Sequence, residues 1–278
     1  MGRMLGRLNL MAAGWMISAV LLGCAGDVSR LAGPALPTAA PSPGMTASPT
    51  VPVLAAPSKT PTVNLPTAIL RASVTQSPLP EFTVCSPLQD HPLDELRLIV
   101  SDPYRPPPGK SDDRHHGVDF SYYRYAERTT IQGLGVQSVL SGSVAAALAD
   151  TYPFGNLVIV ETVYEMLPED LRIELGIQPG ESLYLLYAHM EAAPHVRSGD
   201  AVQPCQGLGA VGRSGNAVEP HLHLEARLGP PGALFTEMGE YFPEASTEQR
   251  AAYQLWRTSG VFRHLDPMIL INYQLSAQ

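Results

Sequence analysis

The stretch Pro220-His221-Leu222-His223-Leu224-Glu225 decides the fold and points to the chemistry of this chain. Polar and apolar residues alternate along it, and a period of two is typical of a β-strand that buries one face. His221 and His223 therefore share one face, while Leu222 and Leu224 point to the other face, into a core. A metal site is one reason for two imidazoles side by side on one strand face, although a lone His-x-His pair in a strand is often incidental.

Further short apolar runs predict more strands on the N-terminal side of this one. Glycines and prolines separate the runs, which favours an antiparallel or mixed sheet arrangement. The predicted strands are Leu96–Val100, Ser138–Ala146, Asn156–Glu161, Ser182–His189 and His221–Arg227. We therefore expect a mainly β fold, with antiparallel β-sheets packed in a compact sandwich-like or barrel-like domain.

Helical patterns are few and short. Leu167–Leu175 is typical of a short helix, with Pro168 at its start and Gly176 just past its end. Ser246 and Gln249 form the pattern of a capping box, which predicts a second helix beginning there.

A second cluster, His115-His116-Gly117-Val118-Asp119, adds a histidine and a carboxylate in a turn that the glycine is expected to keep flexible. Two imidazoles and one carboxylate form a known ligand set for catalytic zinc, which leaves the fourth position for water. Tyr187-Ala188-His189 lies between the two clusters and supplies another histidine. The remaining histidines read as ordinary surface or packing residues; they are His91, His116, His195 and His264.

Taken together, these segments resemble the lysostaphin-type peptidases of family M23. Three motifs carry the resemblance, in the order and spacing of the family: Arg114–Phe120, Tyr187–Met190 and Pro220–Glu225. The Gly-Asn strand that begins at Gly155, the glycine-punctuated hairpins after Gly199 and the closing pair Asp266-Pro267 are also similar to the family.

The resemblance implies a role for each matching position. His115, Asp119 and His223 correspond to the ligands of one Zn²⁺ per domain, and His189 and His221 to catalytic histidines that do not bind the metal. It also implies a zinc-dependent endopeptidase that hydrolyses peptide bonds in peptidoglycan cross-links or stems with a metal-activated water. One of the two catalytic histidines takes the proton of the water, and His221 is the stronger candidate because it shares a strand with a ligand.

The chain departs from the family pattern at several places. Glu219 stands where a glycine is usual, and Leu224 replaces an aromatic residue. Two insertions, near residues 163–181 and 229–262, are either walls of the substrate groove or surface decoration, and the first is the stronger candidate for a wall.

Two other functions compete with this interpretation. A catalytically silent relative would bind cell wall or activate an amidase, but all five site positions are filled here. A zinc carboxypeptidase or amidase would act on the same polymer, but the His115–Asp119 spacing and the Tyr187-Ala188-His189 motif favour the endopeptidase.

Residues 1–23 have the composition of an export signal. Arg3 and Arg7 supply positive charge, and the apolar run Leu10–Gly23 is shorter than the ~20 residues that a membrane-spanning helix needs. The run ends at Leu21-Leu22-Gly23-Cys24, which resembles a bacterial lipobox, so Cys24 is expected to carry lipid and to anchor the protein in a membrane. The alternative is an uncleaved membrane anchor, and both place the rest of the chain outside the cytoplasm, on the outer face of the membrane or in the periplasm.

The remainder divides into a tether and a folded domain. Residues 24–80 are rich in Pro, Thr, Ser and Ala and are expected to form a disordered tether. Residues 81–278 are expected to form the M23-like peptidase domain. Cys85 and Cys205 are expected to form a disulfide outside the cell, the alternative being two buried thiols. The formal net charge of -8 argues against a nucleic-acid partner, because such proteins usually carry a basic face.

Overall fold

The computed structural model describes residues 82–108 and 110–277. The expected signal peptide, the lipid on Cys24 and the tether at residues 24–80 lie outside the described residues and stay predictions. Within the described part, no helix combines the length and the apolar character that crossing a membrane requires.

The described chain is mainly β, with three short α-helices and two single 3₁₀ turns. The strands are β1 (Val100–Asp102), β2 (Gly117–Phe120), β3 (Gly135–Gln137), β4 (Gly142–Thr151), β5 (Gly155–Val163), β6 (Ser182–Met190), β7 (Ala201–Val202), β8 (Gly207–Ala210), β9 (Leu222–Gly229) and β10 (Arg263–Leu265). The helices are α1 (Glu169–Leu175), α2 (Thr247–Arg257) and α3 (Met268–Ser276), and the 3₁₀ turns are η1 (Leu96–Leu98) and η2 (Tyr164–Met166).

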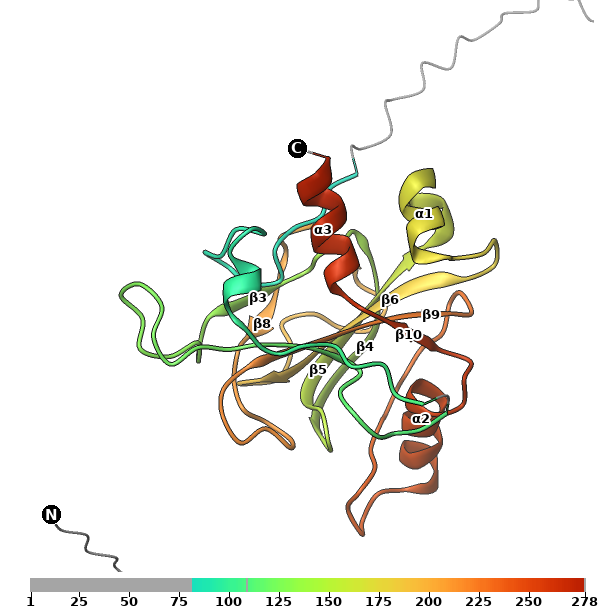
Figure 1. The fold of residues 1–278 in the computed structure, drawn as a ribbon. Helices are drawn as coiled ribbons and strands as arrows, with labels where there is room; N and C mark the ends of the chain where they lie inside the picture. Colours follow the sequence, from blue (N-terminus) through green and yellow to red (C-terminus); the bar gives the residue numbers. More distant parts are fainter. Residues whose placement is uncertain (1–81, 109, 278) are drawn as a thin grey trace, which may run out of the picture. The chain divides into compact units, whose positions relative to one another are not determined.

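Most strands form one antiparallel sheet in the order β1-β2-β9-β6-β5-β4-β7, with β10 also paired to β9. Figure 1 labels the neighbouring strands β4, β5, β6, β9 and β10 of this sheet. β3 and β8 make a separate antiparallel pair. The central strands β5, β6 and β9 are buried along almost their whole length, which means that both faces of the sheet are covered. The predicted mainly β, antiparallel fold is confirmed, but the sheet stays open and is no closed barrel.

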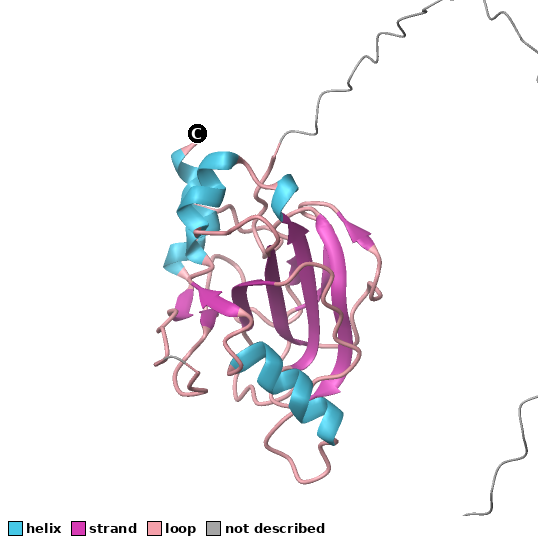
Figure 2. Ribbon diagram, turned by 90° about the vertical axis from the view of Figure 1, so that its right-hand side faces the viewer, coloured by secondary structure: helices cyan, strands magenta, loops and turns pink. Residues whose placement is uncertain are grey.

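Each face of the sheet has its own apolar cluster. Leu222 and Leu224 belong to one cluster, together with residues of β3, β8, α1 and α3. The other cluster contains Tyr184 and Leu186 of β6, and it is completed by residues from the segment 229–262, including Trp256 of α2. Figure 2 shows α2 at one end of the domain, away from α1 and α3.

Two of the predicted strands differ from the elements in the structure. The apolar run at residues 96–100 is mostly the 3₁₀ turn η1, because Leu96 and Ile99 are buried while Leu98 is 75% exposed. Burial at positions three apart is the spacing of a helical turn rather than of a strand. The strand predicted from Ser138 begins at Gly142 and continues to Thr151.

The two predicted helices and the predicted disulfide are confirmed. α1 follows Pro168 and ends at Gly176, whose positive φ of 65° is the left-handed conformation that glycine favours. Ser246 and Gln249 form the expected reciprocal capping box at the start of α2. Cys85 and Cys205 are joined, which links two positions 120 residues apart in the chain. The sequence patterns did not predict α3.

Candidate metal centre

The register of two neighbouring strands places the proposed ligands together. Asp119 of β2 stands directly opposite His223 of β9 in the antiparallel ladder, and side chains in such a pair lie on the same face about 5 Å apart. His115 precedes β2 in the chain and lies on the same face. Sheet pairing therefore brings His223 together with two residues that are more than 100 positions away in the sequence.

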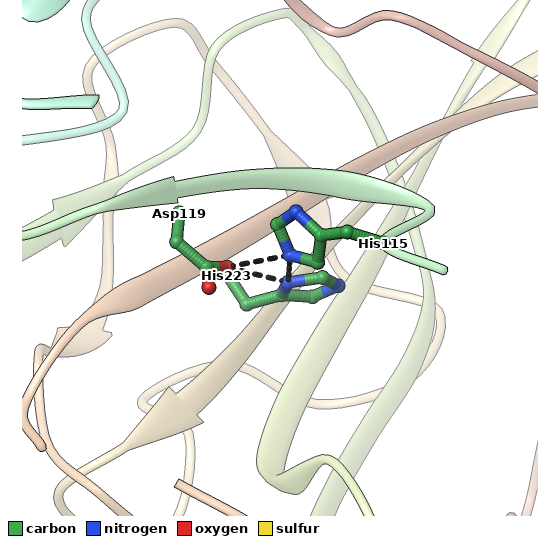
Figure 3. Close-up of side chains that lie close together, drawn as sticks. All are labelled: His115, Asp119 and His223. Atoms are coloured by element: carbon green, nitrogen blue, oxygen red, sulfur yellow. Dashed lines mark hydrogen bonds and ion pairs between the residues drawn. The ribbon is translucent and has the colours of Figure 1, made fainter. Parts of the chain in front are cut away.

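The three side chains converge on one point (Figure 3). His115 Nε2 lies 2.9 Å from Asp119 Oδ1 and 3.0 Å from His223 Nδ1, and His223 Nδ1 lies 2.7 Å from the same carboxylate oxygen. The candidate ligand atoms all lie within 4.8 Å of one another. Two imidazole nitrogens and a carboxylate oxygen so arranged fit zinc, which accepts this donor set with one position left open.

Outer partners fix which nitrogen of each histidine faces this point. His115 Nδ1 lies 3.2 Å from the carbonyl oxygen of Pro103, which can only accept, so Nδ1 donates to it and Nε2 is the nitrogen that can bind a metal. His223 Nε2 lies 3.1 Å from the Glu225 carboxylate and donates to it, so Nδ1 is the nitrogen that can bind a metal once it has lost its proton. Hydrogen bonds of this kind orient histidines that bind metals.

The electrostatics of the site favour positive charge at the point of convergence. Burial alone would lower the pKa of His223, but hydrogen bonds to Asp119 and Glu225 and the charges of these carboxylates raise it to about 9. Burial likewise would raise the pKa of Asp119, yet hydrogen bonds from His115 and His223 hold it far below its usual range. Surroundings that stabilise a proton here would also stabilise a metal cation.

His189 reaches the site through a break in strand alternation. Asn156 pairs with Met190 and Val158 with Tyr187, so β6 carries an extra residue between these two pairs. Such a bulge re-aims a side chain, and His189 has the positive φ of 63° that turns it toward His223. Its Nδ1 lies 2.8 Å from the carbonyl oxygen of Ser214 and must donate to it, so Nε2 is free to accept a proton.

Burial and neighbouring rings keep the buried His189 neutral. Desolvation, together with the charges of His223 and His221, lowers the pKa of His189 to about 3. Its ring centroid lies 4.6 Å from that of His221.

His221 lies just before β9 and belongs to the same site. Its Nδ1 lies 2.8 Å from the carbonyl oxygen of Glu219, and its Nε2 lies 3.6 Å from Asp119 Oδ2. The ring therefore turns its Nε2 toward the proposed ligands. All five residues singled out in the sequence are thus brought together.

Gly117 has a different role from the one predicted. It is the first residue of β2 rather than part of a turn, and its φ is not positive. A Cβ atom at this position would overlap the carbonyl oxygen of Leu224 and lie 3.0 Å from Cε1 of His223. The glycine is needed because β2 and β9 approach closely beside the ligands.

The five residues line a cavity of about 320 Å³ whose walls differ from those expected. Among the described residues, none from the insertion 163–181 lines this cavity. The helix of that insertion, α1, contacts α3 instead. The segment 229–262 contributes Tyr241, Tyr253 and Arg257. The expectation that the first insertion was the better candidate for a wall was wrong, because α2 covers the sheet face that bears the ligands. The exposed side chain of Glu219 lines a separate hollow.

Sequence patterns missed several residues that support the site. Glu225 was part of the decisive stretch, but no role was assigned to it, and Asp112 and Arg257 had no local pattern that could reveal them. The remaining histidines are packing or surface residues: His91 and His116 are buried, His264 is half-buried and His195 is exposed. His116 Nδ1 accepts a hydrogen bond of 2.8 Å from Arg227.

Comparison with family models agrees with the motifs. Residues 113–232 match the family model described as peptidase family M23. Among solved structures, the catalytic domain of lysostaphin from Staphylococcus simulans is 25% identical, with 50% of this chain and 87% of that chain covered and a TM-score of 0.34. A zinc-containing peptidase from Vibrio cholerae is 20% identical, with 46% and 33% covered and a TM-score of 0.32. No curated protein matches the chain significantly.

Proposed function

We propose that this chain, whose residues 113–232 match peptidase family M23, is a zinc-dependent endopeptidase. Its proposed substrates are peptide bonds in peptidoglycan cross-links or stems. The observation that carries the proposal is the convergence of His115, Asp119 and His223 within 4.8 Å, beside two further histidines with free Nε2 atoms. A bound Zn²⁺ would polarise the scissile carbonyl and lower the pKa of a water toward ~7.

The residues of the chain would bind the metal and transfer the proton. His115 Nε2, Asp119 Oδ1 and His223 Nδ1 would hold the ion. We assign removal of the water proton to His221, because its Nε2 lies 3.6 Å from Asp119 Oδ2 and so faces the ligands. The same proton must end on the amine of the cleaved peptide bond. His189, whose ring centroid is 4.6 Å away, can help to deliver it there.

Digestion of purified cell wall tests the proposal. The purified protein should release soluble peptides from peptidoglycan, lose this activity with a zinc chelator and regain it when zinc is added. Mass spectrometry of the products distinguishes the alternatives: an internal peptide bond cut supports an endopeptidase, release of a terminal residue a carboxypeptidase, and release of the whole stem from the sugar an amidase. A zinc-loaded protein that releases nothing would favour the silent relative.

We also propose that the protein is exported and held at a membrane by lipid on Cys24. Support comes from the sequence alone, through the charged start, the short apolar run and the pattern that ends at Cys24. Labelling with a radioactive fatty acid should mark the wild-type protein in the membrane fraction, and Cys24→Ala should abolish the label. A wild-type protein that takes up no label would contradict the proposal.

A further inference from the structure

One arginine joins the two carboxylates that lie behind the proposed metal ligands. Arg257, at the end of α2, donates from Nε to Asp112 Oδ1 at 2.6 Å and from Nη1 to Glu225 Oε1 at 2.8 Å. Its side chain is only 10% exposed. A planar guanidinium with two donors in fixed directions holds two acceptors in one geometry, which a flexible lysine does not do.

The first carboxylate acts on the ligand His223. Glu225 is fully buried, and its Oε1 receives both the Arg257 hydrogen bond and that of His223 Nε2 at 3.1 Å. Its Oε2 is held by Arg227 Nε and by Trp256 Nε1, both at 2.9 Å. Glu225 is therefore held on both carboxylate oxygens, and it fixes the Nε2 side of the His223 ring.

The second carboxylate acts on the segment that carries His115. Asp112 stands three positions before this ligand and accepts hydrogen bonds from the hydroxyl groups of Tyr241 and Tyr253 as well as from Arg257. Arg257 is the one cationic partner of Asp112 among the ion pairs of residues 82–108 and 110–277. The chain just before the metal ligand is thereby tied to α2 and to the loop before it.

We propose that Arg257 is a positioning residue for the metal centre, which fixes the approach of His223 through Glu225 and that of His115 through Asp112. Arg257 and Asp112 both lie outside residues 113–232, the range that matches the family. The segment 229–262 therefore supports the metal ligands as well as lining the cavity. The inference rests on the metal site of the proposed function but not on the reaction that is catalysed there.

Zinc affinity, measured by competition with a chromogenic chelator, tests this inference. We expect Arg257→Met to weaken zinc binding by about 10–100-fold, the range found when an outer hydrogen-bond partner of a metal ligand is lost. Arg257→Lys keeps the positive charge but lacks the planar guanidinium with its two fixed donors. Its zinc affinity should lie between that of Arg257→Met and that of the wild type. Cobalt-substituted protein should show a changed visible spectrum in Arg257→Met, because these absorption bands report on ligand geometry.

Arg250→Met is the matched control. Arg250 lies on the same helix and is also well bonded, but its partners are Glu240, Phe242 and Ala245, all within the segment 229–262. Its loss should leave zinc affinity within about twofold and the cobalt spectrum unchanged, even if it lowers stability as much as Arg257→Met does.

Several outcomes would overturn the inference. Unchanged zinc affinity in folded Arg257→Met would do so, as would an equal loss in Arg250→Met. If Arg257→Met fails to fold, Arg257→Lys and the isosteric Asp112→Asn decide, and wild-type affinity in both would reject the role. A wild-type protein that binds no zinc would reject both this inference and the proposed function. One that binds zinc but leaves peptidoglycan intact would reject the endopeptidase alone.

Discussion

Nδ1 of His223 lies 2.7 Å from Oδ1 of Asp119, although 104 residues separate the two in the chain. They stand opposite each other in the β2–β9 ladder. Because Asp119 also contacts His115, the carboxylate is the common neighbour of both imidazoles. Its pKa is held far below the usual range by these histidines, so it is ionised at any pH at which the protein would work.

We therefore expect Asp119→Ala and His223→Ala each to abolish both metal binding and hydrolysis. Each substitution removes a proposed ligand, so the loss of zinc affinity should exceed the roughly 10–100-fold cost of losing an outer partner. Metal content after dialysis and turnover of cell wall are the two measurements. A His223→Ala protein that remained active would refute the ligand assignment.

The neighbouring substitution His221→Ala should separate metal binding from catalysis. His221 contacts Asp119 only at 3.6 Å and is not one of the converging ligand residues, so zinc affinity should stay close to that of the wild type. Turnover should fall by about 10²–10⁴-fold, the usual contribution of general acid–base catalysis. Metal content and hydrolysis measured on one preparation make the comparison, and a parallel loss of zinc would instead place His221 among the ligands.

Local patterns in the sequence predicted β6 and β9, two of the strands that carry this site, but not β2, where a turn was expected. Alternation predicted the faces of Leu222 and His223, and burial confirms them, because the leucine belongs to the apolar cluster on the opposite side. The capping box at Ser246 predicted the start of α2 correctly. Such features depend on neighbours within a few positions, so the sequence shows them directly.

Contacts between distant segments could not be predicted in the same way. The bulge that turns His189 toward the site depends on how β5 and β6 pair. Arg257 lies 145 residues from Asp112, and nothing near either residue indicates the other. The covering of the ligand face by segment 229–262 follows from the packing of Trp256 and Phe262 on β6, which length and composition alone do not specify.

Acid should weaken the link between Asp112 and α2. Burial alone would raise the pKa of Asp112, but the charge of Arg257 and hydrogen bonds from Tyr241, Arg257 and Tyr253 lower it below its ordinary value. A carboxyl group whose pKa is lower in the folded state stabilises the fold above the unfolded pKa of ~3.9, and this contribution is lost as pH falls through the folded value.

Asp112→Asn tests this pH dependence. At pH 7 it should lower the free energy of unfolding by about 1–3 kcal/mol, because hydrogen bonds to a charged group are replaced by weaker ones. The difference from the wild type should shrink as pH falls below about 4, the unfolded pKa of aspartate. Urea unfolding between pH 7 and pH 3 provides the measurement, with the exposed neighbour Asp113→Asn as control. A difference that stayed constant over this range would mean that the charge of Asp112 does not contribute.

The close approach of β2 and β9 should make Gly117→Ala damaging to both the fold and the metal site. The added methyl group would overlap the backbone carbonyl of Leu224 and press on the ring of His223, so the ladder that sets Asp119 opposite His223 must shift. We expect a loss of about 1–3 kcal/mol in the free energy of unfolding, as for other overpacked positions. Zinc affinity should fall as well.

Gly207→Ala is the matched control, since Gly207 also begins a strand but a methyl group added there would have nothing within 4 Å. Urea unfolding and zinc titration of both variants decide the point, because equal behaviour of the two would show that the space beside His223 is not limiting.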